Sequence, residues 1–172
     1  MIKVILIATG LIWMPIHIWA QNELRRLDFL MGEWNVMAEI RLSAQGPWDA
    51  SKGKAIIKKE VGSKVINEDH YGSLEGKSYI TKSLLAYSKS NQLYQRVFAD
   101  SEHGVFVDYT GIFKGDSLVF DKLFMYPDKS TVKLKVIYSI LSKDEFIVEN
   151  SRMPESATGW DVTGRLRYKR NR

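Results

Sequence analysis

Histidines, carboxylates and cysteines build metal sites and many catalytic sites, and this sequence offers few of them. It contains no cysteine, which excludes disulfide bonds, thiolate metal sites and cysteine nucleophiles. After the first 20 residues, His70 and His103 are its only histidines. Glu68 and His70 share one face of an expected strand, but a zinc site needs three or four converging ligands. We therefore expect no metal site and no bound cofactor.

Nucleophilic and acid–base catalysis leave no clear pattern in the sequence either. No Ser-His-Asp arrangement stands out, and neither Gly-x-Ser-x-Gly nor a phosphate-binding glycine loop is present. Asp100 and Asp108 could approach each other across strands, but positions in turns and on the surface explain both. We expect no catalytic residue, and a small-molecule hydrolase or isomerase stays an alternative.

Polar residues inside expected strands are the other candidates for chemistry. Asn150 and Arg152 are in phase with Phe146, and the segment around Tyr71 is polar on both faces. If these side chains point inward they need partners, since a buried unpaired polar group costs about 1 to 3 kcal/mol. A polar ligand would satisfy them, whereas strands exposed near an opening would need none. Adding strand aromatics, the candidate ligand-binding residues are Tyr71, Tyr87, Phe98, Tyr109, Asn150 and Arg152.

The elements that would position these residues are short strands. Trp34, Val36 and Ala38 alternate with polar residues, and similar segments recur with turns about every 8 to 12 residues. Sequential hairpins without long helices close most simply as an up-and-down barrel, which removes exposed sheet edges. We predict an all-β fold, a single antiparallel up-and-down β-barrel of about ten strands. The expected strands cover residues 34–42, 53–61, 64–73, 78–88, 92–99, 105–113, 117–125, 131–141, 145–152 and 159–169.

A short helix is expected ahead of the first strand, over residues 22–31. Leu24, Leu27 and Leu30 form its apolar face, Asn22 can cap its start, and Gly32 ends it. This helix would close one end of the barrel.

The first 20 residues have the composition of a secretory signal peptide. Lys3 gives a positive start, residues 4–13 form an apolar run, and Ala20 is the small residue before a cut. The mature chain, residues 21–172, would be exported to the periplasm or beyond in a Gram-negative-like bacterium, with no membrane span after cleavage. Without cysteine it would not be a lipoprotein. An uncleaved anchor is the alternative.

Size, composition and charge describe one ordinary folded domain. The chain has 172 residues, of which 45% are hydrophobic and 26% charged. Its net charge of +5 is scattered along the sequence, whereas nucleic-acid binding proteins concentrate positive charge on one face. We expect no nucleic-acid partner, and a monomer or homodimer.

Four sequence segments resemble an uncharacterised family of exported bacterial calycin-like barrels, in the superfamily of lipocalins, fatty-acid-binding proteins and nitrobindin-type barrels. They are residues 27–34 (LDFLMGEW), 85–88 (LAYS), 96–100 (RVFAD) and 163–168 (TGRLRY). The resemblance implies a structural role for Gly32 and Trp34, with Trp34 plugging the closed end and Arg165 or Arg167 packing across it. Nitrobindin-type barrels bind haem through a histidine near the C-terminus, and this chain has none after His103.

The sequence therefore favours an exported, non-enzymatic barrel that binds a small, partly apolar molecule in its interior. Aromatic side chains would form the walls, and Tyr71, Asn150 and Arg152 would be the polar anchors. Besides the hydrolase or isomerase, the alternative is a barrel with a filled core that binds a protein or an envelope component.

Overall fold

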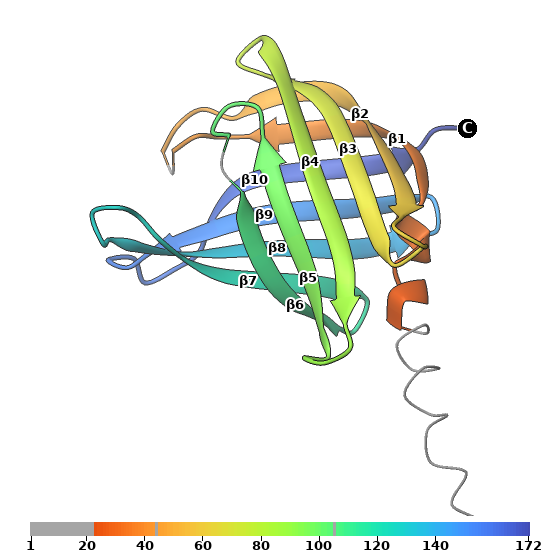
Figure 1. Ribbon diagram of the computed structural model, residues 1–172. Helices are drawn as coiled ribbons and strands as arrows, with labels where there is room; N and C mark the ends of the chain where they lie inside the picture. Colours follow the sequence, from red (N-terminus) through yellow and green to blue (C-terminus); the bar gives the residue numbers. More distant parts are fainter. Residues whose placement is uncertain (1–22, 44, 105) are drawn as a thin grey trace, which may run out of the picture.

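Ten antiparallel strands form one closed barrel (Figure 1) in the computed structural model, which describes residues 23–43, 45–104 and 106–172. Each strand pairs with its neighbour in sequence, and β1 closes the barrel against β10, which confirms the predicted up-and-down barrel. The expected signal peptide and Asn22 lie outside the described residues. The strands are β1 (Gly32–Ile40), β2 (Asp49–Glu60), β3 (Val65–Leu74), β4 (Lys77–Ser88), β5 (Leu93–Asp100), β6 (Val107–Lys114), β7 (Ser117–Met125), β8 (Thr131–Ser142), β9 (Glu145–Pro154) and β10 (Asp161–Arg170).

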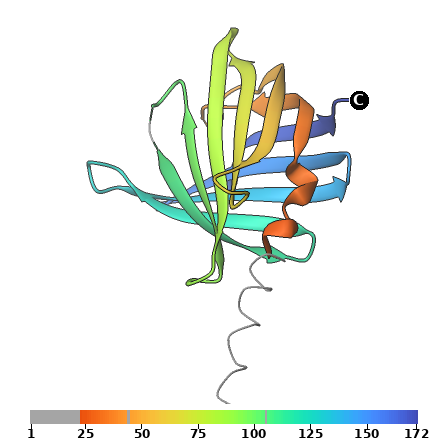
Figure 2. The same ribbon diagram turned by 45° about the vertical axis from the view of Figure 1, so that its right-hand side comes forward.

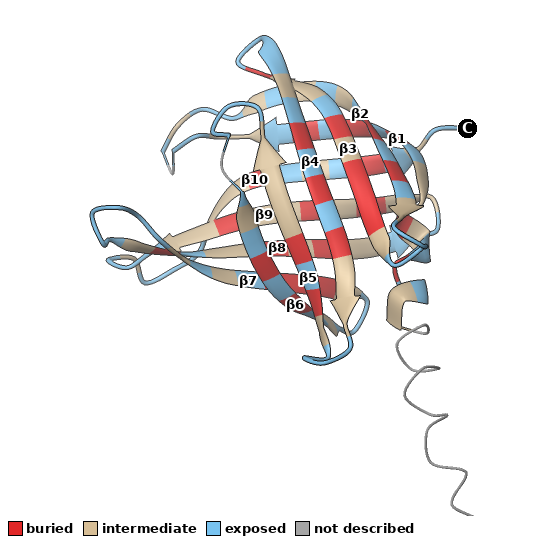
Figure 3. Ribbon diagram, viewed as in Figure 1, coloured by how far each residue is buried: buried red, intermediate tan, exposed pale blue. Residues whose placement is uncertain are grey.

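Alternation between buried and exposed residues sets which side chains fill the barrel. In β1, Trp34, Val36 and Ala38 are buried, while the residues between them are exposed. The same alternation runs through the neighbouring strands (Figure 3), as a strand with one face towards a core requires. No helix in the described part of the chain is long and apolar enough to cross a membrane.

The barrel has a closed end and an open end. The connections at the closed end are short turns, at residues 61–64, 89–92, 115–116 and 143–144. A helical segment covers this end (Figure 2), and the C-terminal residues reach it too. At the open end lie the longer connections, which join β1 to β2, β5 to β6, β7 to β8 and β9 to β10.

The helical segment is less regular than the sequence predicts. Residues 23–25 are helical, a turn follows, and a 3-10 helix, η1 (Asp28–Leu30), leads into β1. Leu27 and Leu30 are fully buried against the barrel core. The predicted apolar face therefore packs as expected, although the helix itself is interrupted.

Trp34 fills the closed end beneath this segment. Its side chain is 1% exposed, and its indole Nε1 donates a hydrogen bond of 2.8 Å to the carbonyl of Leu30. The ring packs edge-on against Phe146, with 4.8 Å between the ring centroids, and Phe146 in turn stacks on Tyr168 at 4.3 Å. The first strand, the ninth and the tenth are joined here by one aromatic cluster.

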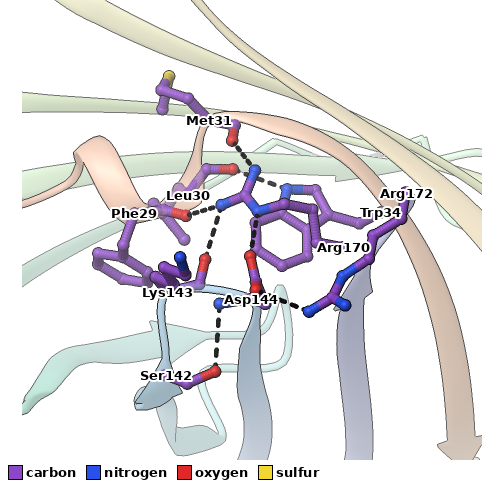
Figure 4. Close-up of polar contacts among 9 residues, drawn as sticks. All are labelled: Phe29, Leu30, Met31, Trp34, Ser142, Lys143, Asp144, Arg170 and Arg172. Carbon is purple, nitrogen blue, oxygen red and sulfur yellow. Dashed lines mark hydrogen bonds and ion pairs between the residues drawn. The ribbon is translucent and has the colours of Figure 1, made fainter.

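Arg170 completes the closure (Figure 4). Its guanidinium carbon lies 4.3 Å from the centroid of the Trp34 ring, a cation–π contact. Its nitrogens donate hydrogen bonds to the carbonyls of Met31 (2.7 Å) and Lys143 (2.8 Å) and to the Asp144 carboxylate (3.0 Å). One side chain therefore ties β10 to the helical segment and to the β8–β9 turn.

Gly32 is required where Arg170 passes. Its φ of +129° is a conformation that residues with a side chain rarely adopt. A Cβ atom at this position would lie 2.5 Å from Nη1 of Arg170, which is a steric collision. The glycine of Gly-x-Trp thus makes room for the arginine that covers the tryptophan.

The resemblance implied that Arg165 or Arg167 packs across Trp34, but the arginine that does so is Arg170. Both of the expected arginines are exposed on the outer face, where they form ion pairs with Glu149 (3.0 Å) and Glu145. Trp34 and Arg170 are direct partners in the β1–β10 register, so their side chains share the inner face. Arg165 and Arg167 stand an odd number of residues away and point outward.

Replacing Arg170 by methionine tests this closure. Arg170→Met loses the hydrogen bonds and the contact with Trp34, so we expect the free energy of unfolding to fall by about 3 kcal/mol. The matched variant Arg165→Met removes only an exposed ion pair and should cost less than about 0.5 kcal/mol. Urea denaturation of both variants measures the difference, and equal losses would contradict the assignment.

Candidate functional site

A cavity of about 330 Å³ opens at the open end of the barrel. Its walls come from both halves of the sheet and combine apolar with polar side chains. The apolar lining includes Ile40, Leu74, Phe98, Leu134 and Val136, and the polar lining includes Tyr79, Arg96, Asp100, Tyr109, Asn150 and Arg152. A concave site with apolar walls and a few polar groups is the usual form of a small-molecule pocket.

Arg96 is the deepest of the lining residues on β5. Phe98 and Asp100 follow it towards the open end. The Arg96 side chain is 5% exposed, and its Nη2 donates a hydrogen bond of 3.0 Å to the hydroxyl of Ser83. Its Nε has no hydrogen-bond partner in the part of the chain that the structure describes.

Aromatic rings surround the Arg96 guanidinium where a counter-ion would be expected. Its carbon lies 4.7 Å from the ring centroid of Phe98, 5.4 Å from that of Tyr109 and 6.0 Å from that of Tyr138. Among the described residues, no carboxylate lies within ion-pair distance of it. Cation–π contacts offset part of the loss of hydration, but they do not replace an anion.

Glu68 is also buried in the described part of the barrel, and Tyr168 holds its carboxyl group. The Tyr168 hydroxyl donates a hydrogen bond of 2.6 Å to Oε1 of Glu68, and both residues are almost fully buried. Burial raises the pKa of Glu68, against the hydrogen bond from Tyr168 and the charge of Arg96, which favour the carboxylate. The residues that line the cavity do not include Glu68.

His70 is buried on the same face of β3, 2% exposed. Neither ring nitrogen has a hydrogen-bond partner among the described residues. Two glycines make room for the ring: a Cβ atom at Gly53 would lie 2.9 Å from Nε2, and one at Gly72 3.0 Å from Cε1. Burial lowers the pKa of His70 to about 4, so the imidazole is neutral near neutral pH. No group of three His, Cys, Asp or Glu in the described residues is arranged to hold a metal ion.

The structure brings four of the six predicted ligand-binding residues to the cavity. Phe98, Tyr109, Asn150 and Arg152 all line it, from β5, β6 and β9. Arg152 also pairs with Asp161 on the neighbouring strand β10, with 3.4 Å between Nε and the carboxylate. The aromatic and polar residues chosen from these three strands therefore converge on one space.

Tyr87 and Tyr71 lie elsewhere. Tyr87 faces inward near the closed end of β4 and packs against Tyr94, with 5.1 Å between the ring centroids. Tyr71 is 49% exposed and lines a groove on the outer surface of β2 and β3. Its neighbours Glu68 and His70 take the inner face of β3, so alternation directs Tyr71 outward.

Arg96, the most buried cation among the described residues, is the residue that sequence reasoning missed. A charged residue in a strand normally indicates the solvent face. The spacing of Arg96 indicated the opposite. Tyr94 and Phe98 lie two residues before and after it, so all three share one face of the strand, and both aromatic residues contact the core. A charge in phase with two core aromatics points to a buried functional group.

Comparisons with known proteins identify a family and a fold. Residues 20–170 match the family described as "Protein of unknown function (DUF1579)". Comparison with curated proteins gives no match. The barrel is similar to Rv2717c from M. tuberculosis, with a TM-score of 0.58 and 12% identity, over 87% of this chain and 97% of that one. It is also similar to the S-type phycobiliprotein lyase from Guillardia theta, with a TM-score of 0.55 and 11% identity, over 88% and 92% of the two chains. These likenesses show a shared calycin-like fold.

Buried neutral His70 should make stability depend on pH. The unfolded histidine binds a proton near its ordinary pKa of 6.5, whereas the folded one does so only near 4. As pH falls through this window, the wild type should lose up to about 3 kcal/mol of stability relative to His70→Gln. Urea denaturation of residues 21–172 across this range measures the difference. The control His103→Gln, on an exposed loop, should retain the fall, and parallel profiles for wild type and His70→Gln would contradict the prediction.

Proposed function

We propose that this chain, which belongs to the DUF1579 family, binds a small, partly apolar molecule in the cavity at the open end of its barrel and does not catalyse a reaction on it. The observation that carries the proposal is the cavity itself, with apolar walls and the buried Arg96 at its inner end. A barrel whose core were filled throughout would leave no such space. The volume of about 330 Å³ lies near the lower limit of typical ligand pockets, which suits a small molecule.

The division of the barrel into two halves supports this reading. Near the closed end, Trp34, Phe146 and Tyr168 pack ring against ring and fill the interior. Towards the open end, the inner-facing positions include Asn150 and Gly164, where the missing side chain of the glycine leaves the Asn150 amide its room. Side chains therefore fill one half, and the other half retains space for a ligand.

A hydrolase or isomerase that uses the barrel interior is the second candidate. One observation favours it: burial raises the pKa of Glu68, a shift that is common among catalytic acids and bases. However, Glu68 is hydrogen-bonded to Tyr168 and lies outside the lining of the cavity. A molecule in the cavity would reach Arg96 before it reached Glu68, and this order favours binding over catalysis.

Native mass spectrometry of the protein purified gently from its own host tests the binding proposal. We expect a discrete added mass that denaturation removes. Leu134→Trp should abolish it, because Leu134 lines the cavity and an indole would occupy the space. The control Leu123→Trp places the same group on the neighbouring strand, where Leu123 is 60% exposed, and should keep the added mass. A wild-type protein of bare mass, or equal loss in both variants, would contradict the proposal.

We also propose that the protein is exported and acts in the periplasm or outside the cell. The composition of residues 1–20 supports this, with Lys3 ahead of an apolar run and Ala20 before a cut. Intact mass measurement after cell fractionation should find a chain that begins at Gln21 in the periplasmic or secreted fraction. Full-length protein in the cytoplasm would refute export.

A further inference from the structure

We infer that Arg96 is the receptor for a carboxylate group on the molecule that the cavity binds. The inference rests on the proposed function of the cavity and names the class of ligand: a small carboxylic acid with an apolar body. Four observations carry it, namely the burial of Arg96, its missing counter-ion, the direction from which it can be reached and the charge of the cavity walls.

A buried guanidinium without an anion is costly. The Arg96 side chain is 5% exposed, and its Nη2 donates a hydrogen bond to the hydroxyl of Ser83, which is neutral. Removing a charge from water without pairing it costs several kcal/mol. A bound anion would offset this cost. An anion against Arg96 would satisfy both the charge and the unpartnered Nε.

Glu68 does not fill this role within the protein. Its carboxyl group accepts the hydrogen bond from Tyr168 and lies beyond ion-pair distance of the Arg96 nitrogens. Each still influences the pKa of the other through its charge, but from beyond ion-pair distance. The interior therefore holds a cation that lines the cavity and a carboxyl group that does not, and the two do not form an ion pair.

The approach to Arg96 is restricted to the cavity. Rings of Phe98, Tyr109 and Tyr138 surround the guanidinium, and Ser83 occupies one of its donors. Because Arg96 lines the cavity, an incoming group meets it there. Guanidinium N–H groups lie in one plane and match the two oxygens of a carboxylate. Phe98, Leu134 and other apolar lining residues would then contact the remainder of the ligand.

The charge of the cavity walls fits an anion. The lining contains four cationic side chains, Arg41, Arg96, Lys135 and Arg152, and a single carboxylate, Asp100. Asp100 accepts hydrogen bonds from the backbone of residues 102 and 103 and pairs with the His103 ring. Its charge is therefore partly used within its own loop. Arg41 and Arg152 share the carboxylate of Asp161, and the walls still carry more positive than negative charge, which attracts an anion from solution.

Matched acid and amide probes test the inference on residues 21–172. Acetate and hexanoate carry the charge, and acetamide and hexanamide have the same size without it. We expect hexanoate to bind at least about tenfold more tightly than hexanamide by calorimetry. In nitrogen-15 NMR spectra, the Arg96 Nε–H resonance should shift saturably with acetate and with hexanoate. Arg96→Met should abolish the preference for acids, whereas Arg165→Met, on the outer face, should leave it unchanged.

The folding of the variants is controlled separately. Replacing an unpaired buried charge by an apolar side chain of similar length is often neutral or stabilising. If Arg96→Met nevertheless fails to fold, Arg96→Lys keeps the charge but loses the planar pair of donors. This variant should then reduce the acid preference in part.

Two outcomes would overturn the inference. Equal binding of acids and amides with an unmoved Arg96 resonance would show a cavity that takes neutral molecules, so the proposed function would stand without the carboxylate. No binding of acetate or hexanoate at millimolar concentrations would also exclude the receptor role. An added mass on the wild-type protein in native mass spectrometry would still support a ligand in that case, so the two failures are distinguishable.

Discussion

The packing of the Arg170 guanidinium on Trp34 is the contact on which the rest of the barrel depends. A sheet of ten antiparallel strands becomes a barrel only where β1 meets β10, and this pair of residues stands at the end of that seam. The same guanidinium binds carbonyls of the helical segment and of the β8–β9 turn. The contact that joins the two edges of the sheet therefore also closes one end of the barrel, and the interior cavity opens at the other end.

The interior changes character along the barrel axis. The aromatic cluster around Trp34 and Phe146 is buried and packed ring against ring, as a core that stabilises the fold should be. The interior also holds the carboxyl group of Glu68, the imidazole of His70 and the guanidinium of Arg96, all buried. Both ring nitrogens of His70 and Nε of Arg96 lack a hydrogen-bond partner among the described residues. Polar groups of this kind lower the stability of a barrel that holds nothing. Of these three groups, Arg96 is the one that lines the cavity, which is why we favour binding over catalysis.

The local sequence pattern predicted the strands. Which side chains meet inside the barrel depends on which of two alternating sets of positions faces inward, and in some strands the pattern does not decide this. Clear alternation at Trp34, Val36 and Ala38 made the first strand and its buried face predictable. In β10, arginines and apolar residues stand close together, and a shift of one position decides which arginine faces Trp34. The register that selects Arg170 is set by closure against β1, a long-range effect. In β3, polar residues occupy both faces, so nothing local revealed that Tyr71 points outward. Arg96 escaped notice because its burial arises from the barrel around it.

Both described ends of the chain lie at the closed end, where the helical segment packs and where Arg172 pairs with Asp144, 3.2 Å away. The mouth of the cavity faces the opposite direction. A tag, a carrier domain or a surface linkage added at either end would therefore sit behind the barrel and leave ligand entry unobstructed. If the protein were immobilised through one of these ends, the cavity openings of all its molecules would therefore face the solution.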